Sequence, residues 1–254
     1  MQIRWTRGAS CALVFLPLLF GLFLRRRTNH GHFHVLGGKT LLLTAHPDDE
    51  TFFFSPTLSA LSQVDSDVFV VSLSTGNAKG LGDVRRVEFT RALGVFGVGE
   101  ERSVVLNHPG LQDNKTASWD PTLIAQVLYP FVVENNISTI LTFDSLGITH
   151  HPNHRSTFAG ASQLVSNSAW QQRLPPRLFT LRSQPETRHI GPLAAFLPPS
   201  TVHFTASLPD YITALHAMCQ HKSQLRFVSL PFAKGLLSRY LWVNEWVQIV
   251  DWSE

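Results

Sequence analysis

Cysteine and charge are both scarce in this chain of 254 residues. The two cysteines, Cys11 and Cys219, lie far apart and the first is in an apolar segment, so we expect no disulfide and no need for an oxidising compartment. Charged residues make up 15% of the chain and hydrophobic ones 44%, a globular composition on the apolar side. This length suits one α/β domain with an appendage rather than two domains.

Acidic residues are absent from the first 27 positions, although these contain five arginines. Of the 21 basic side chains, 16 lie outside this stretch, against 18 acidic ones. The rest of the chain is therefore slightly negative, and we predict no basic face for nucleic acid. Internal repeats and low-complexity segments are absent as well.

Residues 9–24 form an uncharged, largely apolar run with arginines on both sides. As a helix it would span roughly 24 Å, slightly less than a thin bilayer core, and Trp5 and the flanking arginines can make up the difference. Three arginines at 25–27 stand where a signal peptide needs small residues for cleavage. A retained membrane anchor in residues 1–27 is therefore favoured over a cleaved signal or a buried helix.

A linker at residues 28–38 separates this anchor from a folded domain at 39–254. Within the domain, short apolar stretches alternate with segments of helical spacing. The predicted strands are 40–44, 68–73, 103–106 and 139–143, and the predicted helices are 52–61, 83–96, 121–135 and 152–170. Strands that are apolar on both faces indicate an α/β fold, with a Rossmann-like, mostly parallel sheet sandwiched by helices.

Polar clusters follow three of these strands, at 46–50, 74–77 and 144–154. In a parallel sheet such positions share the carboxyl edge, where ligands bind. The first cluster contains three adjacent carboxylates, which repel one another in a partly buried crevice unless a cation lies between them. The cluster therefore indicates a divalent metal. Simple capping of the next helix by these acids is the alternative.

A second histidine cluster precedes the predicted helix at 152–170. His151 and His154 are three residues apart, so on a helix they share one face, although an ordinary polar turn is the alternative. Two histidines and one carboxylate form a typical catalytic zinc shell with a position left for water, whose pKa bound zinc lowers to about 7. Non-haem iron oxygenases use the same ligand types, so another divalent metal stays open.

The motif AHPDDE at 45–50, together with HPNH at 151–154, resembles the LmbE-like/PIG-L family of zinc-dependent de-N-acetylases. Supporting similarities are STGN at 74–77, DVRRVEF at 83–89, TFD at 142–144, KSQ at 222–224 and SRY at 238–240. The resemblance covers residues 39–244. It implies His46, Asp49 and His154 as zinc ligands, Asp48 as the general base and His151 as the residue that stabilises the tetrahedral oxyanion.

Arg85, Asn77 and Asp144 are further candidates for substrate binding, with Arg85 suited to hydroxyl or phosphate oxygens. An ion pair between Arg85 and Glu88 on the same helix is an equal alternative.

Two neighbours of the predicted ligands have less defined roles. Asn153 stands where bacterial relatives of this family often have aspartate, which removes a carboxylate next to His151 that would influence the protonation of His151. Glu50 is interpreted as a capping or supporting residue.

The resemblance implies metal-dependent hydrolysis of the N-acetyl group of N-acetylglucosaminylphosphatidylinositol, which yields glucosaminylphosphatidylinositol and acetate in the second step of GPI anchor biosynthesis. It also implies Zn²⁺ as the cofactor and a glycolipid substrate in the membrane. The expected location is the endoplasmic reticulum membrane, with a single span and the catalytic domain facing the cytosol. The alternatives are de-N-acetylation of another sugar conjugate and a catalytically silent, membrane-tethered binding module.

Two further features bear on membrane contact. Residues 225–250 are rich in aromatic residues. We interpret them as a last strand and helix that close the core, and the alternative is a surface that rests on the bilayer. Asn114 and Asn136 begin glycosylation sequons, which should stay unmodified if the domain faces the cytosol.

Overall fold

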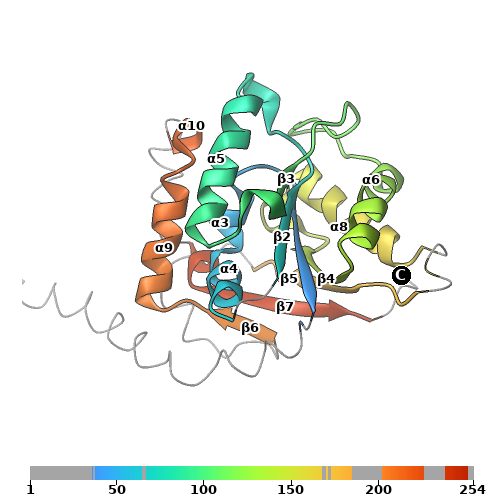
Figure 1. The fold of residues 1–254 in the computed structure, drawn as a ribbon. Helices are drawn as coiled ribbons and strands as arrows, with labels where there is room; N and C mark the ends of the chain where they lie inside the picture. Colours follow the sequence, from blue (N-terminus) through green and yellow to red (C-terminus); the bar gives the residue numbers. More distant parts are fainter. Residues whose placement is uncertain are drawn as a thin grey trace, which may run out of the picture.

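The computed structural model describes residues 36, 38–64, 67–167, 170, 173–184, 202–225 and 238–250. The strands in these ranges are β1 (Lys39–Thr44), β2 (Val68–Ser72), β3 (Ser103–Val105), β4 (Ile137–Phe143), β5 (Arg177–Leu181), β6 (Val202–Thr205) and β7 (Val243–Ile249). They form one sheet in the order β3-β2-β1-β4-β5-β7-β6 (Figure 1). The strands from β3 to β5 in this order are parallel, and β7 is antiparallel to both of its neighbours.

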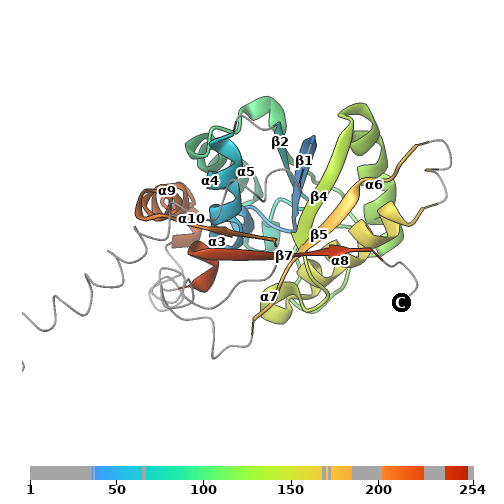
Figure 2. The same ribbon diagram turned by 90° about the horizontal axis from the view of Figure 1, so that it is seen from below.

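Helices cover both faces of the sheet (Figure 2). On one face α4 (Ser55–Ser62) and α5 (Gly82–Val95) pack against α9 (Leu208–Met218), and on the other α6 (Pro121–Glu134) packs against α8 (Pro152–Val165). This arrangement confirms the predicted α/β fold with a mostly parallel sheet between helices.

The central strands are apolar on both faces because helices cover both. Leu41, Leu42 and Leu43 of β1 are at most 1% exposed, and each contributes about 1.5–3 kcal/mol through burial. In register, Leu41 pairs with Phe69 of β2 on one side and with Ile140 of β4 on the other. The parallel pairing brings the ends of these strands to one edge, where the polar loops begin.

The predicted helix at 52–61 is wrong in one respect, because the structure has two helices there. The first is α3 (Asp49–Phe53) and the second is α4, with Phe54 between them at φ −119° and ψ 4°. Pro56, in the first turn of α4, has no N–H, and its ring would collide with the carbonyl of Phe52 in a continuous helix. The break lets α3 carry the acidic motif independently of α4.

The carboxyl-terminal part of the sheet was only partly predicted. After residue 170, the only elements expected from the sequence were a strand and a helix in the aromatic segment 225–250. Its described part contains β7 and a short 3₁₀ turn, η6 (Arg239–Leu241), while residues 226–237 lie outside the described ranges. The predicted last strand is present as β7, which pairs with β5 and places Thr180 opposite Val247.

The described ranges contain no helix with both the length and the hydropathy needed to cross a bilayer. The predicted anchor at residues 1–27 lies outside those ranges, as does most of the predicted linker at 28–38.

Candidate active site

The carboxyl ends of β1 and β4 are neighbours at the point where the strand order changes direction. From β1 the chain proceeds to β2 and β3 on one side, and it then returns through α6 to β4 on the other side. In open α/β sheets, ligands bind outside the sheet at such a switch point. The loop after β1 leads into the acidic motif, and the segment after β4 leads through α7 (Gly147–His150) into the second histidine cluster.

Asp49 lies between two imidazoles that come from these two segments. Its Oδ1 is 3.2 Å from Nε2 of His154, and its Oδ2 is 3.6 Å from Nδ1 of His46. Asp49 Oδ2 also accepts the backbone N–H groups of Ala45 and His46, at 3.1 and 2.8 Å. All three side chains are buried. The structure thus brings together the three residues that were predicted as metal ligands.

The outward nitrogens of both imidazoles face hydrogen-bond acceptors. His46 Nε2 is 3.1 Å from Asn153 Oδ1, and His154 Nδ1 is 3.1 Å from the carbonyl oxygen of Gly147. Acceptors at these positions place a proton on each outward nitrogen, which fixes the orientation of the ring. The inward nitrogens, His46 Nδ1 and His154 Nε2, are then left to share either a proton or a cation with Asp49.

The charges around His46 favour a positive group at this point. Burial lowers the pKa of His46, but hydrogen bonds to Asp113 and Asp49 outweigh it and raise the pKa from 6.5 to about 10. Burial would raise the pKa of Asp49, yet His154 and His46 hold it well below its usual range. A divalent cation can replace the proton that His46 would otherwise hold. The donor set therefore fits a divalent metal ion.

His151 completes the histidine cluster, but its hydrogen bonding differs. One ligand atom from each of His46, His151 and His154 lies within 4.8 Å of the others, so three imidazoles are a second conceivable ligand set. His151 Nδ1, however, accepts the backbone N–H of Asn153 at 3.2 Å as the N-cap of α8. Burial, aided by the charges of His46 and His154, lowers the pKa of His151 to about 4. The neutral ring then carries its proton on Nε2, which suits a hydrogen-bond donor better than a ligand.

Asp48 occupies a strained backbone position beside this cluster. Its φ is 119° and its ψ is −27°, a conformation that costs about 1–3 kcal/mol for a residue with a side chain. Burial raises the pKa of Asp48 to about 6, although Arg85 opposes this shift, and one of its carboxylate oxygens is 3.2 Å from Arg85 Nη2. The side chain keeps 20% of its surface exposed. A carboxylate with a pKa near neutrality can both accept and return a proton.

Arg85 is buried and forms hydrogen bonds to two loops. Its guanidinium donates to the carbonyl oxygens of Pro47 and Gly76, which follow β1 and β2. Its Nη1 also lies 3.8 Å from Asp113 Oδ2. Glu88, the alternative partner, instead accepts hydrogen bonds from Ser223. These contacts support a positioning role for Arg85, and its contact with substrate stays a prediction.

The other two predicted substrate-binding residues also hold backbone groups. Asn77 Oδ1 accepts the N–H of Gly82 at 2.9 Å, and Asn77 lines a polar cavity of about 230 Å³ beyond β2 and β3. Asp144 accepts hydrogen bonds from Gly147 N–H, at 3.0 Å, and from the N–H and hydroxyl of Ser183. Asp144 therefore positions the carbonyl that orients His154.

Three features of the site could not be found from the sequence. Asp113 comes from the loop after β3 and places Oδ1 3.3 Å from His46 Nε2. The Asn153 side chain was expected to lie next to His151, but its Oδ1 faces His46 Nε2. Its Nδ2 donates to the carbonyl oxygen of Ala117. Glu50 is paired with a histidine from the carboxyl-terminal half of the chain, a contact analysed below.

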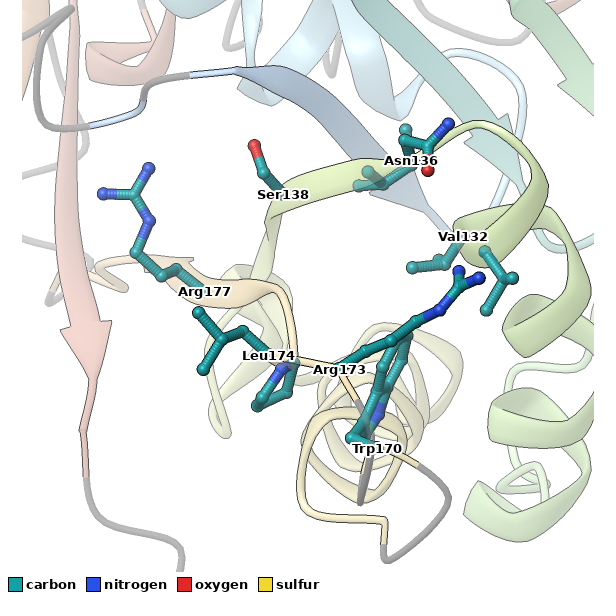
Figure 3. Close-up of a pocket in the computed structure, with 10 residues that line it drawn as sticks. Val132, Asn136, Ser138, Trp170, Arg173, Leu174 and Arg177 are labelled. Atoms are coloured by element: carbon teal, nitrogen blue, oxygen red, sulfur yellow. The ribbon is translucent and has the colours of Figure 1, made fainter.

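A larger groove lies at the opposite edge of the sheet, where β4 and β5 begin (Figure 3). It has a volume of about 350 Å³ and is lined by Trp170, Leu174 and Arg173 among others. The guanidinium of Arg177 at its rim already donates to the carbonyl of Leu36 and to the hydroxyl of Thr139. This groove is separate from the histidine–aspartate cluster.

The fold and the histidine–aspartate cluster together define an α/β protein with a candidate cation site at its switch point. Solved deacetylases share this fold. The N,N'-diacetylchitobiose deacetylase from Pyrococcus horikoshii superimposes with a TM-score of 0.62, covering 98% of this chain and 94% of that one at 17% sequence identity. At this identity the likeness concerns the fold alone.

Comparison with known sequences identifies the family. The chain belongs to the PIG-L family, described as GlcNAc-PI de-N-acetylase, which matches residues 41–165. The N-acetylglucosaminyl-phosphatidylinositol de-N-acetylase of Bos taurus is 30% identical over 214 residues, 82% of each chain. A probable enzyme of the same name from Schizosaccharomyces pombe is 42% identical over 126 residues, and that match spans about half of each chain.

Proposed function

We propose that this chain hydrolyses the N-acetyl group of N-acetylglucosaminylphosphatidylinositol, giving glucosaminylphosphatidylinositol and acetate in the second step of GPI anchor biosynthesis. Family membership and the names of the relatives support this reaction. The observation that carries it is the convergence of two inward imidazole nitrogens on Asp49, with Asp48 and His151 beside them. This arrangement offers a candidate cation site, a base and an oxyanion donor within one cluster of side chains.

His46, Asp49 and His154 are the residues proposed to hold the metal, with Zn²⁺ as the proposed ion. When bound, such an ion supplies Lewis-acid polarisation of the acetamide carbonyl and lowers the pKa of a water molecule towards neutrality. His151 is excluded from this set because its Nδ1 accepts a backbone N–H.

Asp48 is the proposed general base and acid. Its carboxylate takes a proton from the attacking water as the bond between the water oxygen and the carbonyl carbon forms. It then returns that proton to the glucosamine nitrogen as the carbon–nitrogen bond breaks, which releases the free amine and acetic acid, and the acid ionises to acetate in water. Arg85 holds the Asp48 carboxylate in place during both transfers.

His151 is the proposed oxyanion donor. The negative charge that develops on the carbonyl oxygen needs a hydrogen bond that is already in position. The depressed pKa of His151 keeps the ring neutral, and the N-cap contact with Asn153 orients its Nε2–H.

The remaining proposals concern the membrane. Residues 1–27 are proposed to anchor the protein in the endoplasmic reticulum membrane with the catalytic domain in the cytosol, next to its glycolipid substrate. In that location Asn114 stays unglycosylated, and sugar attached to Asn114 in cells would contradict the proposed orientation.

The direct test is acetate release from N-acetylglucosaminylphosphatidylinositol by the full-length chain in detergent. A chelator should abolish the release, and added Zn²⁺ should restore it. Absence of release from the metal-loaded protein would overturn the proposed reaction, and iron-specific, oxygen-dependent turnover would point to an oxygenase. Equal rates on substrates with and without the lipid would favour the alternative, a de-N-acetylase of another sugar conjugate.

A further inference from the structure

The strained backbone of Asp48 is held from both sides. Its N–H donates to Glu50 Oε2 at 2.9 Å, and its carbonyl oxygen accepts the hydroxyl of Thr51 at 2.8 Å. Thr51 N–H and Phe52 N–H also donate to this carbonyl, each at 3.0 Å. The carbonyl therefore has several donors within α3, whereas the N–H depends on the carboxylate of Glu50.

Glu50 in turn depends on His221, which follows 171 positions later in the chain. Glu50 Oε1 is 2.6 Å from His221 Nε2, and neither side chain has any exposed surface. A buried carboxylate next to Asp48 and Asp49 is costly without a partner. His221 therefore holds Glu50 in the orientation that accepts the Asp48 N–H.

The segment around His221 contacts both helices that fix Asp48. The backbone N–H of His221 donates to the carbonyl of Met218 at the end of α9. Two residues later, Ser223 in α10 (Lys222–Leu225) donates to both carboxylate oxygens of Glu88 on α5, at 2.7 and 2.6 Å. α5 also carries Arg85, which holds the Asp48 side chain. Residues 221–223 thus link α3, which fixes the Asp48 backbone, to α5, which fixes its carboxylate.

We propose that His221 is a positioning residue for this active site, acting through Glu50 to keep Asp48 in its strained conformation. The consequence for catalysis rests on the proposed function, whereas the consequence for the Asp48 backbone does not. The two are therefore measured separately.

The variants are chosen to separate hydrogen bonding from packing. His221→Leu removes the donor to Glu50, while His221→Gln keeps one, because the amide nitrogen of Gln lies as many bonds from the backbone as Nε2 of His. His221→Asn is the second loss-of-donor variant, too short to reach Glu50, and replaces His221→Leu if the latter does not fold. His203→Leu is the matched control, a buried histidine on the edge strand β6.

The first readout is steady-state acetate release by full-length protein. In His221→Leu, kcat should fall about 10- to 100-fold, with KM and bound metal within about twofold of the wild type, because Asp48 is misplaced and not removed. His221→Gln should stay within about threefold of the wild-type kcat, and His203→Leu should keep it. Equal losses in His221→Leu and His221→Gln would overturn the proposal, because packing alone would then explain them.

The second readout is amide hydrogen exchange over residues 44–52, which needs no activity. Loss of the Glu50 contact should speed exchange of the Asp48 amide at least about tenfold in His221→Leu but not in His221→Gln or His203→Leu. Unchanged exchange in His221→Leu would overturn the proposal. If wild-type protein releases no acetate, the proposed function fails, while the exchange rates still decide the role of His221.

Discussion

At the scale of single residues, Asp48 combines three properties that are individually unfavourable. It is buried enough for its pKa to rise to about 6, it has a positive φ, and it lies next to Asp49. Such costs persist only where surrounding contacts impose them, and Arg85 and Glu50 supply those contacts. These contacts keep the Asp48 backbone in a strained conformation at the place where the proposed reaction needs a base.

Replacement of this carboxylate tests its role directly. Asp48→Asn should lower kcat for acetate release about 10²- to 10⁴-fold, the usual contribution of general acid–base catalysis. Bound metal should stay near the wild-type level, since Asp48 is not among the proposed ligands. Metal analysis and steady-state kinetics on the same preparation check this. Full function of Asp48→Asn in cells would instead favour the silent binding module.

Asn153 provides a second prediction at this scale. Its Oδ1 orients His46 through Nε2 and also accepts the N–H of Asn114. Asn153→Leu should weaken metal affinity about 10- to 100-fold, as loss of a hydrogen-bond partner of a metal-binding histidine typically does. Competition with a chelator measures the affinity. Gln163→Leu, a change at a half-buried residue on the same helix whose side chain contacts Thr122, serves as the control. Equal affinities in both variants would contradict the role of Asn153.

At the scale of elements, short segments at the ends of strands do the positioning. α3 holds the acidic motif, the start of α8 holds His154, and a buried ion pair joins η6 to β7. In that contact Arg239 Nη2 lies 2.6 Å from Glu245 Oε1, and Gln184 donates to the other oxygen of Glu245. The Tyr240 hydroxyl, next to Arg239, accepts the N–H of Gln184.

Removing only one partner of the Arg239–Glu245 pair should destabilise the fold more than neutralising both partners. Arg239→Met leaves Glu245 as a buried charge without its cation and should lower the free energy of unfolding by about 3–5 kcal/mol. The double variant Arg239→Met/Glu245→Gln should recover a substantial part of that loss, because no buried charge remains. Denaturant unfolding of both proteins checks the prediction, which fails if the single variant lies within 1 kcal/mol of the wild type.

At the scale of the whole molecule, the site joins segments more than one hundred residues apart. A cation held by His46, Asp49 and His154 would connect α3 to α8 in the folded protein only. Zn²⁺ at 100 times its Kd should therefore raise the free energy of unfolding by about 2.7 kcal/mol. Thermal unfolding with and without Zn²⁺ measures this, and His154→Gln should lose the shift. An equal shift in His154→Gln would place the stabilising ion elsewhere.

Much of the fold was predictable because local sequence patterns indicate its strands and helices. Continuous apolar stretches marked β1, β2 and β4, and Asp120 and Pro121 begin α6 as a cap and first-turn proline would predict. Strands β5 and β6 were not predicted, because the preference of a short segment for a strand depends on burial and on neighbouring strands that only the fold supplies.

The sequence by itself determined the parallel α/β sheet and the set of chemical groups at its carboxyl edge, since hydrophobic periodicity and residue type are local properties. Tertiary structure decided how those groups act: that Arg85 meets Asp48 and not Glu88, that Asn153 serves His46, and that His221 reaches Glu50. These contacts join residues 37 to 171 positions apart. Only the packing of α5, α8 and α9 around one sheet edge brings such distant side chains within hydrogen-bonding distance.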